Sequence, residues 1–350
     1  MDEEALIQKV MDELSLEALD HYMDIFPQKQ SFSELVLKVL EGNSNLDIPG
    51  MLWKSFTDSL FLEWNTVGSI LIQVMLVALL FSILEKWTTL GGYGGQVTFF
   101  LSYGGVVLLL VEILARGKTM VQGGINWCVG YMGCMIPVLG GATLLSGKPL
   151  RATVYQELTY SMVLFVEQVM EHLFLPAVDL YVLLVVGNEL LEGRFSWILE
   201  FLFKGVSQGV KLLCGAVLSL QTLEQVMAGA RDVAAGNTVV KALEAIPGLG
   251  NLVKTSGEML VGCTILIRNS IGMAGSILLV VFLLTPLIQI LALEVLMKGL
   301  VVVLEPVALK SITTAVAGLA KGMELYRRLL GWTGILFLAG IAMSCVFGIS

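Results

Sequence analysis

Long apolar runs separated by short polar segments dominate the chain from residue 64 to its last residue. Five of them contain no Asp, Glu, Lys or Arg: 64–84, 88–111, 119–147, 269–293 and 329–350. Each reaches or exceeds the ~20 residues that a helix needs to cross the hydrocarbon of a bilayer. Two further stretches, 158–188 and 195–223, are apolar with scattered charges. The pattern predicts an all-α, polytopic integral membrane protein with about six to eight transmembrane helices.

The first 63 residues have a different pattern, in which apolar positions at helical spacing alternate with acidic residues. The spacing from Leu6 onward predicts one amphipathic helix that ends at Pro27. Ser31 and Glu34 then form a capping box for a second helix, which Gly42 ends. This region holds thirteen acidic residues and four lysines, so the acidity of the chain is concentrated here.

One feature of the sequence occurs twice. Residues 136–150 read IPVLGGATLLSGKPL and residues 246–260 read IPGLGNLVKTSGEML, with seven of fifteen positions identical at an offset of 110. A nearly equal offset relates GVSQGVKL (205–212) to GLAKGMEL (318–325). These matches predict an internal tandem duplication.

The patterns together divide the chain into five regions. They are an acidic amphipathic region (1–63), a transmembrane hairpin (64–114), two membrane repeats (115–223 and 225–335) and a C-terminal transmembrane helix (329–350).

Each repeat contains a Pro-Gly elbow, formed by Pro137 with Gly140 in the first copy and by Pro247 with Gly250 in the second. Proline removes a backbone donor and glycine permits unusual backbone angles, so we expect the helix to break or re-enter at each elbow. Matching interruptions in two halves of a membrane protein point to a central site. The alternative is an ordinary turn between helices at the membrane surface.

Acidic residues interrupt the apolar pattern of the first repeat. Glu167 and Glu171 are four residues apart on one helical face, and Asp179 follows Pro176. Charges inside apolar runs mark a function or a specific partner, and two neighbouring carboxylates favour a bound proton or cation. The alternative is a helix at the interface whose acidic face is in water.

Arg268 and Asn269 interrupt the second repeat. An arginine inside the membrane needs an acid, a carbonyl or a wet cavity, and Glu157 is the first expected partner, with Glu167 the second. The alternative is an arginine that reaches the headgroups from a helix start.

Paired glycines recur at the ends of the two repeats, as Gly205 with Gly209 and Gly318 with Gly322. Glycines four residues apart share one face of a helix and permit close helix packing. We expect these faces to pack within the protein or between subunits.

Composition excludes several classes of function. Hydrophobic residues make up 56% of the chain and charged residues 14%, with a mean hydropathy of +0.83 and a pI of about 4.9, so a nucleic-acid partner is not expected. The five cysteines lie in apolar stretches without a CxxC pair, there are two histidines, and no nucleotide or hydrolase motif is present. We therefore expect no enzyme activity, no metal site and no cofactor.

The second repeat carries a family resemblance. The run from Ala234 to Leu293, with IPGLGN, RNSIG at 268–272 and the Pro286 segment, resembles the stage III sporulation protein AE family of endospore-forming bacteria. FSELVLKVLEG (32–42), the IPVLGG elbow and EPVALKSITTAVAGLAKG (305–322) extend the similarity over most of the chain.

This resemblance implies a multi-pass protein of the mother-cell membrane around the forespore. It implies a non-enzymatic part in a transenvelope channel that resembles specialised secretion systems and supports late forespore gene expression. The implied partners are an ATPase, ring-forming subunits and further copies of the protein, besides membrane lipid. Family members normally begin with a signal peptide, a pattern that MDEEAL does not show.

Two alternatives to this function stand beside it. A small-solute or ion transporter would follow from inverted repeats with broken helices and intramembrane charges. A non-conducting scaffold that recruits the ATPase and ring subunits would place all polar residues at interfaces.

Overall fold

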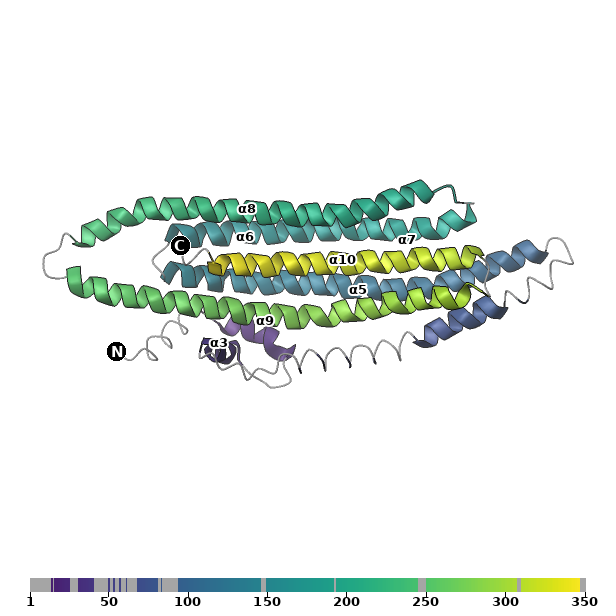
Figure 1. Cartoon of the computed structure of the whole chain (residues 1–350), viewed down its shortest axis with the longest axis horizontal. Helices are drawn as coiled ribbons and strands as arrows, with labels where there is room; N and C mark the ends of the chain where they lie inside the picture. The colour runs from purple at the N-terminus through teal and green to yellow at the C-terminus, as the bar shows by residue number, and fades with distance from the viewer. Residues whose placement is uncertain are drawn as a thin grey trace.

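In a computed structural model, the chain forms a bundle of long helices that lie side by side (Figure 1). The structure describes residues 14, 16–25, 31–40, 50, 53, 57, 61, 68–80, 83, 94–145, 149–191, 193–244, 250–306 and 310–346. Within these ranges it contains helices and turns and no strand, so the all-α prediction is confirmed.

The helices follow one another up and down the long axis of the bundle. Their bounds are α2 Glu17–Asp20, η1 His21–Ile25, α3 Phe32–Leu40, a short apolar helix Gly68–Leu80, α5 Gly94–Leu145, α6 Pro149–Val169, the π-helix η2 Met170–Phe174, α7 Leu175–Leu190, α8 Ser196–Glu244, α9 Gly250–Leu304 and α10 Lys310–Val346. We call α6, η2, α7 and α8 the first hairpin, and α9 with α10 the second hairpin.

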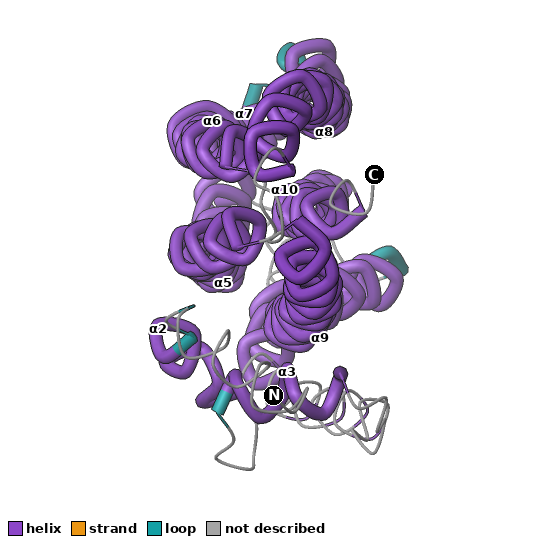
Figure 2. Tube along the Cα trace, turned by 90° about the vertical axis from the view of Figure 1, so that its left-hand side faces the viewer, coloured by secondary structure: helices purple, strands orange, loops and turns teal. Residues whose placement is uncertain are grey.

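The two hairpins run in the same direction. The turn between α7 and α8 and the turn between α9 and α10 lie at the same end of the bundle (Figure 1). Seen along the axis, α6, α7 and α8 form one layer, α5 and α10 the next, and α9 lies below them (Figure 2). We call the end with the two turns the turn end.

Helix α10 is central because it is buried on more than one side. It contacts α5, α7, α8 and α9. One row of its buried positions recurs three or four residues apart, which is the spacing of a helix face that packs against neighbours. This row is Val316, Leu319, Met323, Tyr326, Leu330, Thr333, Phe337 and Ile341, and Leu325, Leu329 and Leu336 are buried outside it.

Among the described residues, four helical segments are long and apolar enough to cross a membrane: Gln156–Leu190, Ser196–Leu223, Ile265–Leu304 and Lys310–Cys345. The two crossings predicted at 88–111 and 119–147 are joined in one continuous helix, α5, of 52 residues. At 1.5 Å per residue, α5 is about 78 Å long, well beyond the ~30 Å of hydrocarbon.

Helix α5 does not break at Pro137 and Gly140, which differs from the predicted elbow. Pro137 lies inside the helix, and the chain stays helical to Leu145. The neighbouring side chains of Ile136, Val138 and Leu139 are buried. Proline costs a helix one hydrogen bond, about 3 kcal/mol, and packing on both sides of the residue offsets that loss. In the second copy, Pro247 lies outside the described residues and Gly250 is the first residue of α9.

The other proline of the first hairpin follows a local change in helix type. The π-helix η2 precedes Pro176, which lies in the first turn of α7. A wide π turn accommodates a residue that cannot donate its backbone hydrogen bond. Glu171 and His172 belong to this turn.

The N-terminal helices pack against α5 and α9. Ser31 Oγ accepts a hydrogen bond from the backbone N of Glu34 (3.2 Å), as the predicted capping box requires. The Tyr22 ring lies edge-on to the rings of Trp127 (5.3 Å between centroids) and Tyr131 (5.5 Å). Burial, and to a lesser extent the neighbouring Cys134, raises the pKa of Tyr22. The amphipathic pattern is thus explained by docking on the bundle.

Candidate functional site: a charged band and the cavity beside it

Charged side chains from four helices, α5, α7, α9 and α10, meet at one level of the bundle. At its first cluster, Asp179 of α7 accepts hydrogen bonds from Lys118 Nζ of α5 (2.6 Å) and from the Tyr326 hydroxyl of α10 (2.9 Å). The side chains of Lys118 and Asp179 are each 40% exposed, so the surrounding medium weakens the electrostatic attraction between them in part. The cluster connects α5, α7 and α10.

A second cluster connects α9 and α10. The carboxylate of Glu294 is 4% exposed and accepts hydrogen bonds from Lys298 Nζ (2.6 Å) and from Arg327 Nε (2.7 Å). Lys298 Nζ also lies 3.7 Å from Glu324 Oε2. A carboxylate this deeply buried needs both cations to compensate for its lost hydration.

Arg328 extends this network to α8. Its guanidinium donates hydrogen bonds to Glu324 and to Ser207 Oγ, and its Cζ lies 5.5 Å from the centre of the Phe203 ring. Arg327 and Arg328 are adjacent on α10 and bind partners on opposite sides of it. We call the two clusters together the charged band: Lys118, Asp179, Ser207, Glu294, Lys298, Glu324, Tyr326, Arg327 and Arg328.

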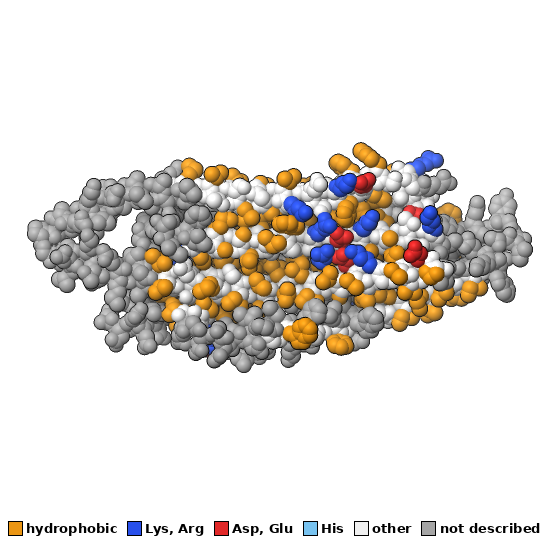
Figure 3. Space-filling model, in the orientation of Figure 1, with side chains coloured by type: hydrophobic (Ala, Val, Ile, Leu, Met, Phe, Trp, Pro, Cys, Tyr) orange, Lys and Arg blue, Asp and Glu red, His pale blue; other side chains and the backbone are white. Residues whose placement is uncertain are grey.

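Figure 3 shows acidic and basic side chains gathered on one part of the visible face, next to a broad area of apolar side chains. The groups of the band neutralise one another through short contacts. This arrangement suits a structural connection among the helices, whereas a catalytic or transport site keeps groups available for a ligand.

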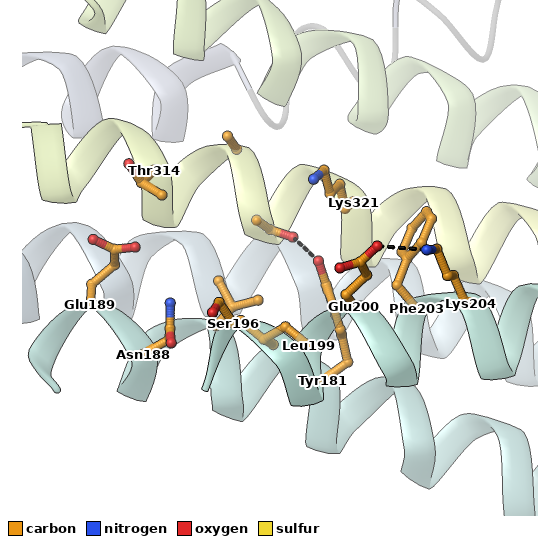
Figure 4. Close-up of a pocket in the computed structure, with 13 residues that line it drawn as sticks. Tyr181, Asn188, Glu189, Ser196, Leu199, Glu200, Phe203, Lys204, Thr314 and Lys321 are labelled. Atoms are coloured by element: carbon orange, nitrogen blue, oxygen red, sulfur yellow. Dashed lines mark hydrogen bonds and ion pairs between the residues drawn. The ribbon is translucent and has the colours of Figure 1, made fainter. Parts of the chain in front are cut away.

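A cavity with available charged groups lies between α7, α8 and α10, next to the band. Its volume is about 450 Å³, which is within the range of small-molecule sites. Two acids and two lysines line it, Glu189, Glu200, Lys204 and Lys321. Lys204 Nζ binds Glu200 Oε1 at 2.6 Å. Tyr181, Asn188, Ser196 and Thr314 supply the other polar groups of the lining (Figure 4).

Residues on either side of the turn between α7 and α8 form one end of this cavity. Gly193 adopts a φ of +81°, which side chains rarely allow, and its backbone N binds the carbonyl of Asn188 at 2.8 Å. The Asn188 side chain accepts a hydrogen bond from the backbone N of Phe195 (2.8 Å). These bonds hold α7 and α8 close together beside Thr314 of α10.

Arg268 of α9 lies beside the C-terminal end of α10 and is 1% exposed. Its Nη2 donates to the backbone carbonyls of Ser344 (2.5 Å) and Cys345 (2.9 Å), and its Nη1 lies 3.5 Å from Thr143 Oγ1. The carbonyls of the last turn of a helix lack partners within the helix and attract cations. Arg268 therefore caps the C-terminus of α10, and carbonyls were one of the three environments expected for it.

The acids predicted from the first repeat lie in different surroundings. Asp179 belongs to the charged band, whereas Glu157 is exposed and Glu167 is half-buried on α6. Glu171 Oε1 and Asn269 Oδ1 are both buried, and neither atom has a hydrogen-bond partner among the described residues. The structure therefore does not bring these residues together into one pathway.

Three of the four predicted packing glycines lie against other helices. A Cβ on Gly318 would meet Val185 Cγ1 at 2.5 Å, one on Gly322 would meet Val182 Cγ2 at 3.1 Å, and one on Gly209 would meet the Phe174 ring at 3.0 Å. A Cβ on Gly205 would meet nothing within 4 Å among the described residues. Gly205 therefore has no packing role in the described bundle.

Most residues of the charged band were not singled out from the sequence, although a signal for four of them exists. Acids precede bases by four residues at five places, which is the orientation that stabilises a helix. Four of these pairs form ion pairs, Glu112–Arg116, Glu200–Lys204, Glu294–Lys298 and Glu324–Arg328, and the last two belong to the band. The fifth is Glu34–Lys38.

The fold and its apolar helices define a class, that of polytopic all-α membrane proteins. A model of the stage III sporulation protein AE family matches residues 30–348, so the chain belongs to that family and the resemblance seen in the sequence is confirmed. No curated protein and no solved structure matches the chain significantly. The family describes a protein of sporulation, and the four candidate spans describe a membrane protein.

Proposed function

We propose that this protein is a non-enzymatic membrane subunit of a transenvelope complex that connects the mother cell and the forespore. The observation that carries the proposal is the family match, which covers residues 30–348 and includes every candidate span. In this proposal the protein lies in the mother-cell membrane around the forespore and assembles with an ATPase, with ring-forming subunits and with its own copies. It supports late gene expression in the forespore.

The direction of the helices favours a platform within such a complex. The two hairpins, which contain the greater part of each proposed repeat, run in the same direction and place both turns at the same end (Figure 1). Transporters with inverted repeats place the corresponding turns on opposite sides of the membrane. A parallel arrangement instead presents two equivalent turns on one face, where a partner with repeated or symmetric subunits would bind both.

The test is an in-frame deletion in an endospore-forming bacterium, complemented with the chain. We expect the deletion strain to engulf the forespore normally and then to lose a late forespore reporter, and the complemented strain to recover it. A tagged chain should co-purify with the ATPase and ring-forming subunits from sporulating cells. Full reporter activity in the deletion strain would contradict the proposal.

A second candidate function is solute or ion transport by the protein itself. It is favoured by Glu171 Oε1 in the π-helix, which is buried and has no hydrogen-bond partner among the described residues, because π turns occur frequently at functional sites. Glu167→Gln and Arg268→Leu should then stop sporulation while the complex still assembles. Normal sporulation in both variants would rule out a pathway along these charges.

A further inference from the structure

The cavity between α7, α8 and α10 separates opposite charges along its length. Glu189 lies at one end near Thr314, and Lys321, Glu200 and Lys204 lie at the other (Figure 4). Glu200 is engaged by Lys204. Among the described residues, neither Glu189 nor Lys321 forms a hydrogen bond, although Lys310 lies close enough to attract Glu189 and Glu200 close enough to attract Lys321. The acid at one end of the cavity and the base at the other therefore keep their hydrogen-bonding capacity for a ligand.

This arrangement selects a ligand by its charge. The two acids and two lysines give the lining no net charge. A neutral ligand with a cation at one end and an anion at the other would give both groups a hydrogen-bonded partner, whereas a simple anion would give none to Glu189 and a simple cation none to Lys321. In the free cavity Lys321 is exposed and Glu189 is half-buried. A ligand that covers these groups removes them from water, which is costly for a charge without a direct partner, so a zwitterion is favoured.

The cavity also lies where a membrane lipid would present such a group. The candidate span Gln156–Leu190 ends here, and the spans Ser196–Leu223 and Lys310–Cys345 begin here. The neighbouring surface of α8 exposes Trp197 and Phe201, whose stacked rings are 74% and 63% exposed. Tryptophan side chains gather at the boundary between hydrocarbon and headgroups, and Phe201 extends the apolar surface beside Trp197.

We infer that the cavity binds the headgroup of an aminophospholipid, such as phosphatidylethanolamine. The ammonium group donates hydrogen bonds to the Glu189 carboxylate, and the phosphate accepts hydrogen bonds from Lys321 and Lys204. The acyl chains lie along the apolar surface that includes Trp197 and Phe201. A choline headgroup cannot replace ethanolamine, because its quaternary nitrogen has no hydrogen to donate to Glu189.

The experiment uses the full chain, purified and placed in nanodiscs of phosphatidylglycerol alone or with added phosphatidylethanolamine or phosphatidylcholine. Bound lipid is measured by native mass spectrometry, and thermal unfolding is followed by tryptophan fluorescence. We expect phosphatidylethanolamine to remain bound and to raise Tm, and phosphatidylcholine to do neither. Lys321→Gln and Glu189→Gln should each weaken binding about tenfold, the loss expected for one charged hydrogen bond.

Matched controls separate the cavity from a general effect of charge. Lys211→Gln removes an exposed lysine of α8 that lies over Trp332 outside the cavity, and Glu305→Gln removes an exposed acid after α9. Both control variants should bind phosphatidylethanolamine as the unaltered chain does.

Three results would overturn the inference: equal retention of phosphatidylcholine, unchanged binding in Lys321→Gln and Glu189→Gln, or an equal loss in the control variants. Soluble glycerophosphoethanolamine provides a further arm. If glycerophosphoethanolamine binds to the chain in phosphatidylglycerol nanodiscs as tightly as phosphatidylethanolamine does, the ligand is a free solute and the inference of a membrane lipid is wrong. None of these results depends on the proposed part in sporulation, which the deletion strain tests separately.

Discussion

The first and second hairpins contain related sequences in unlike surroundings. Gly205 and Gly209 of α8 correspond to Gly318 and Gly322 of α10, yet Gly318 lies tightly against Val185, whereas a Cβ on Gly205 would meet no atom of the described residues within 4 Å. Half of the apolar span of α10 is buried inside the bundle (50%), compared with 28% for α8. The same spacing of small residues therefore closes the core in one hairpin and leaves a free face in the other.

The first hairpin also has charged residues at positions where the second hairpin has apolar ones. At an offset of 110 residues, Glu167 and Glu171 of the first hairpin correspond to Ile277 and Val281 of the second. Val281 is buried in the core, while both glutamates are only half-buried. The first hairpin keeps polar groups because its outer side does not have to fill the core, and this side is available for lipid or for a partner.

The largest difference in stability should come from placing leucine at Gly318 and, separately, at its counterpart Gly205. Gly318→Leu forces a side chain into the space of Val185, and overpacking of this kind costs about 2–3 kcal/mol of folding free energy. The thermal unfolding midpoint in detergent should fall clearly. Gly205→Leu should leave it unchanged or raise it slightly, because leucine favours helix more than glycine does.

The Gly205→Leu variant also tests what covers the free face. If a second copy of the chain packs there, this variant should unfold normally in detergent and yet migrate as a smaller complex in native membranes. Equal loss of stability in Gly205→Leu and Gly318→Leu would contradict the difference between the hairpins.

The next effect concerns two acids that each bind a lysine four residues later. Glu294→Gln removes a buried carboxylate that holds Lys298 and Arg327, and we expect a loss of about 2 kcal/mol, less than the value for a fully buried pair because both cations are partly exposed. Glu200→Gln removes an exposed partner of Lys204 and should have no measurable effect. Thermal unfolding of the two variants in parallel measures the contrast, and similar midpoints would show that the band adds no stability.

A smaller effect is expected at the C-terminus of α10, where Arg268 of the second hairpin corresponds to Leu158 of the first. Arg268→Met leaves the carbonyls of Ser344 and Cys345 without their donor, at a cost of about 1–2 kcal/mol confined mainly to the last turn. The native Cys345 thiol reports the loosening, since maleimide should label it faster. Arg194→Met, in the exposed turn between α7 and α8, is the control and should leave the labelling rate unchanged.

The class of fold was predictable because the membrane imposes it. Uncharged runs of more than twenty residues admit few structures other than helices, and the capping box at Ser31 and Glu34 is a local signal that needs no tertiary information. The family resemblance was readable for a similar reason, since it rests on contiguous motifs.

The continuity of α5 could not be read from local rules. Proline and glycine at 137 and 140 favour a break, and only the packing of buried neighbours, which depends on distant helices, outweighs that tendency. The cavity escaped prediction for the same reason: Glu189 and Lys321 are 132 residues apart in sequence, and no local motif relates them. Their common location depends on the pairing of α7 with α10.

The smallest effect on stability should follow from replacing the polar residue of the π-helix with its counterpart from the second hairpin. Glu171→Val removes a carboxylate oxygen that is buried without a hydrogen-bond partner among the described residues, so we expect folding free energy to change by less than about 1 kcal/mol, and in the favourable direction. Glu171→Gln, which keeps the shape of the side chain and removes its charge, should have a similar effect on thermal unfolding.

Spore yield then shows whether Glu171 is only a tolerated polar group or has a function. Spore yields near those of the unaltered chain in both variants would make Glu171 a tolerated polar group on the outer side of the first hairpin, whereas loss of spores with intact folding would mean that the difference between the hairpins serves proton or cation binding.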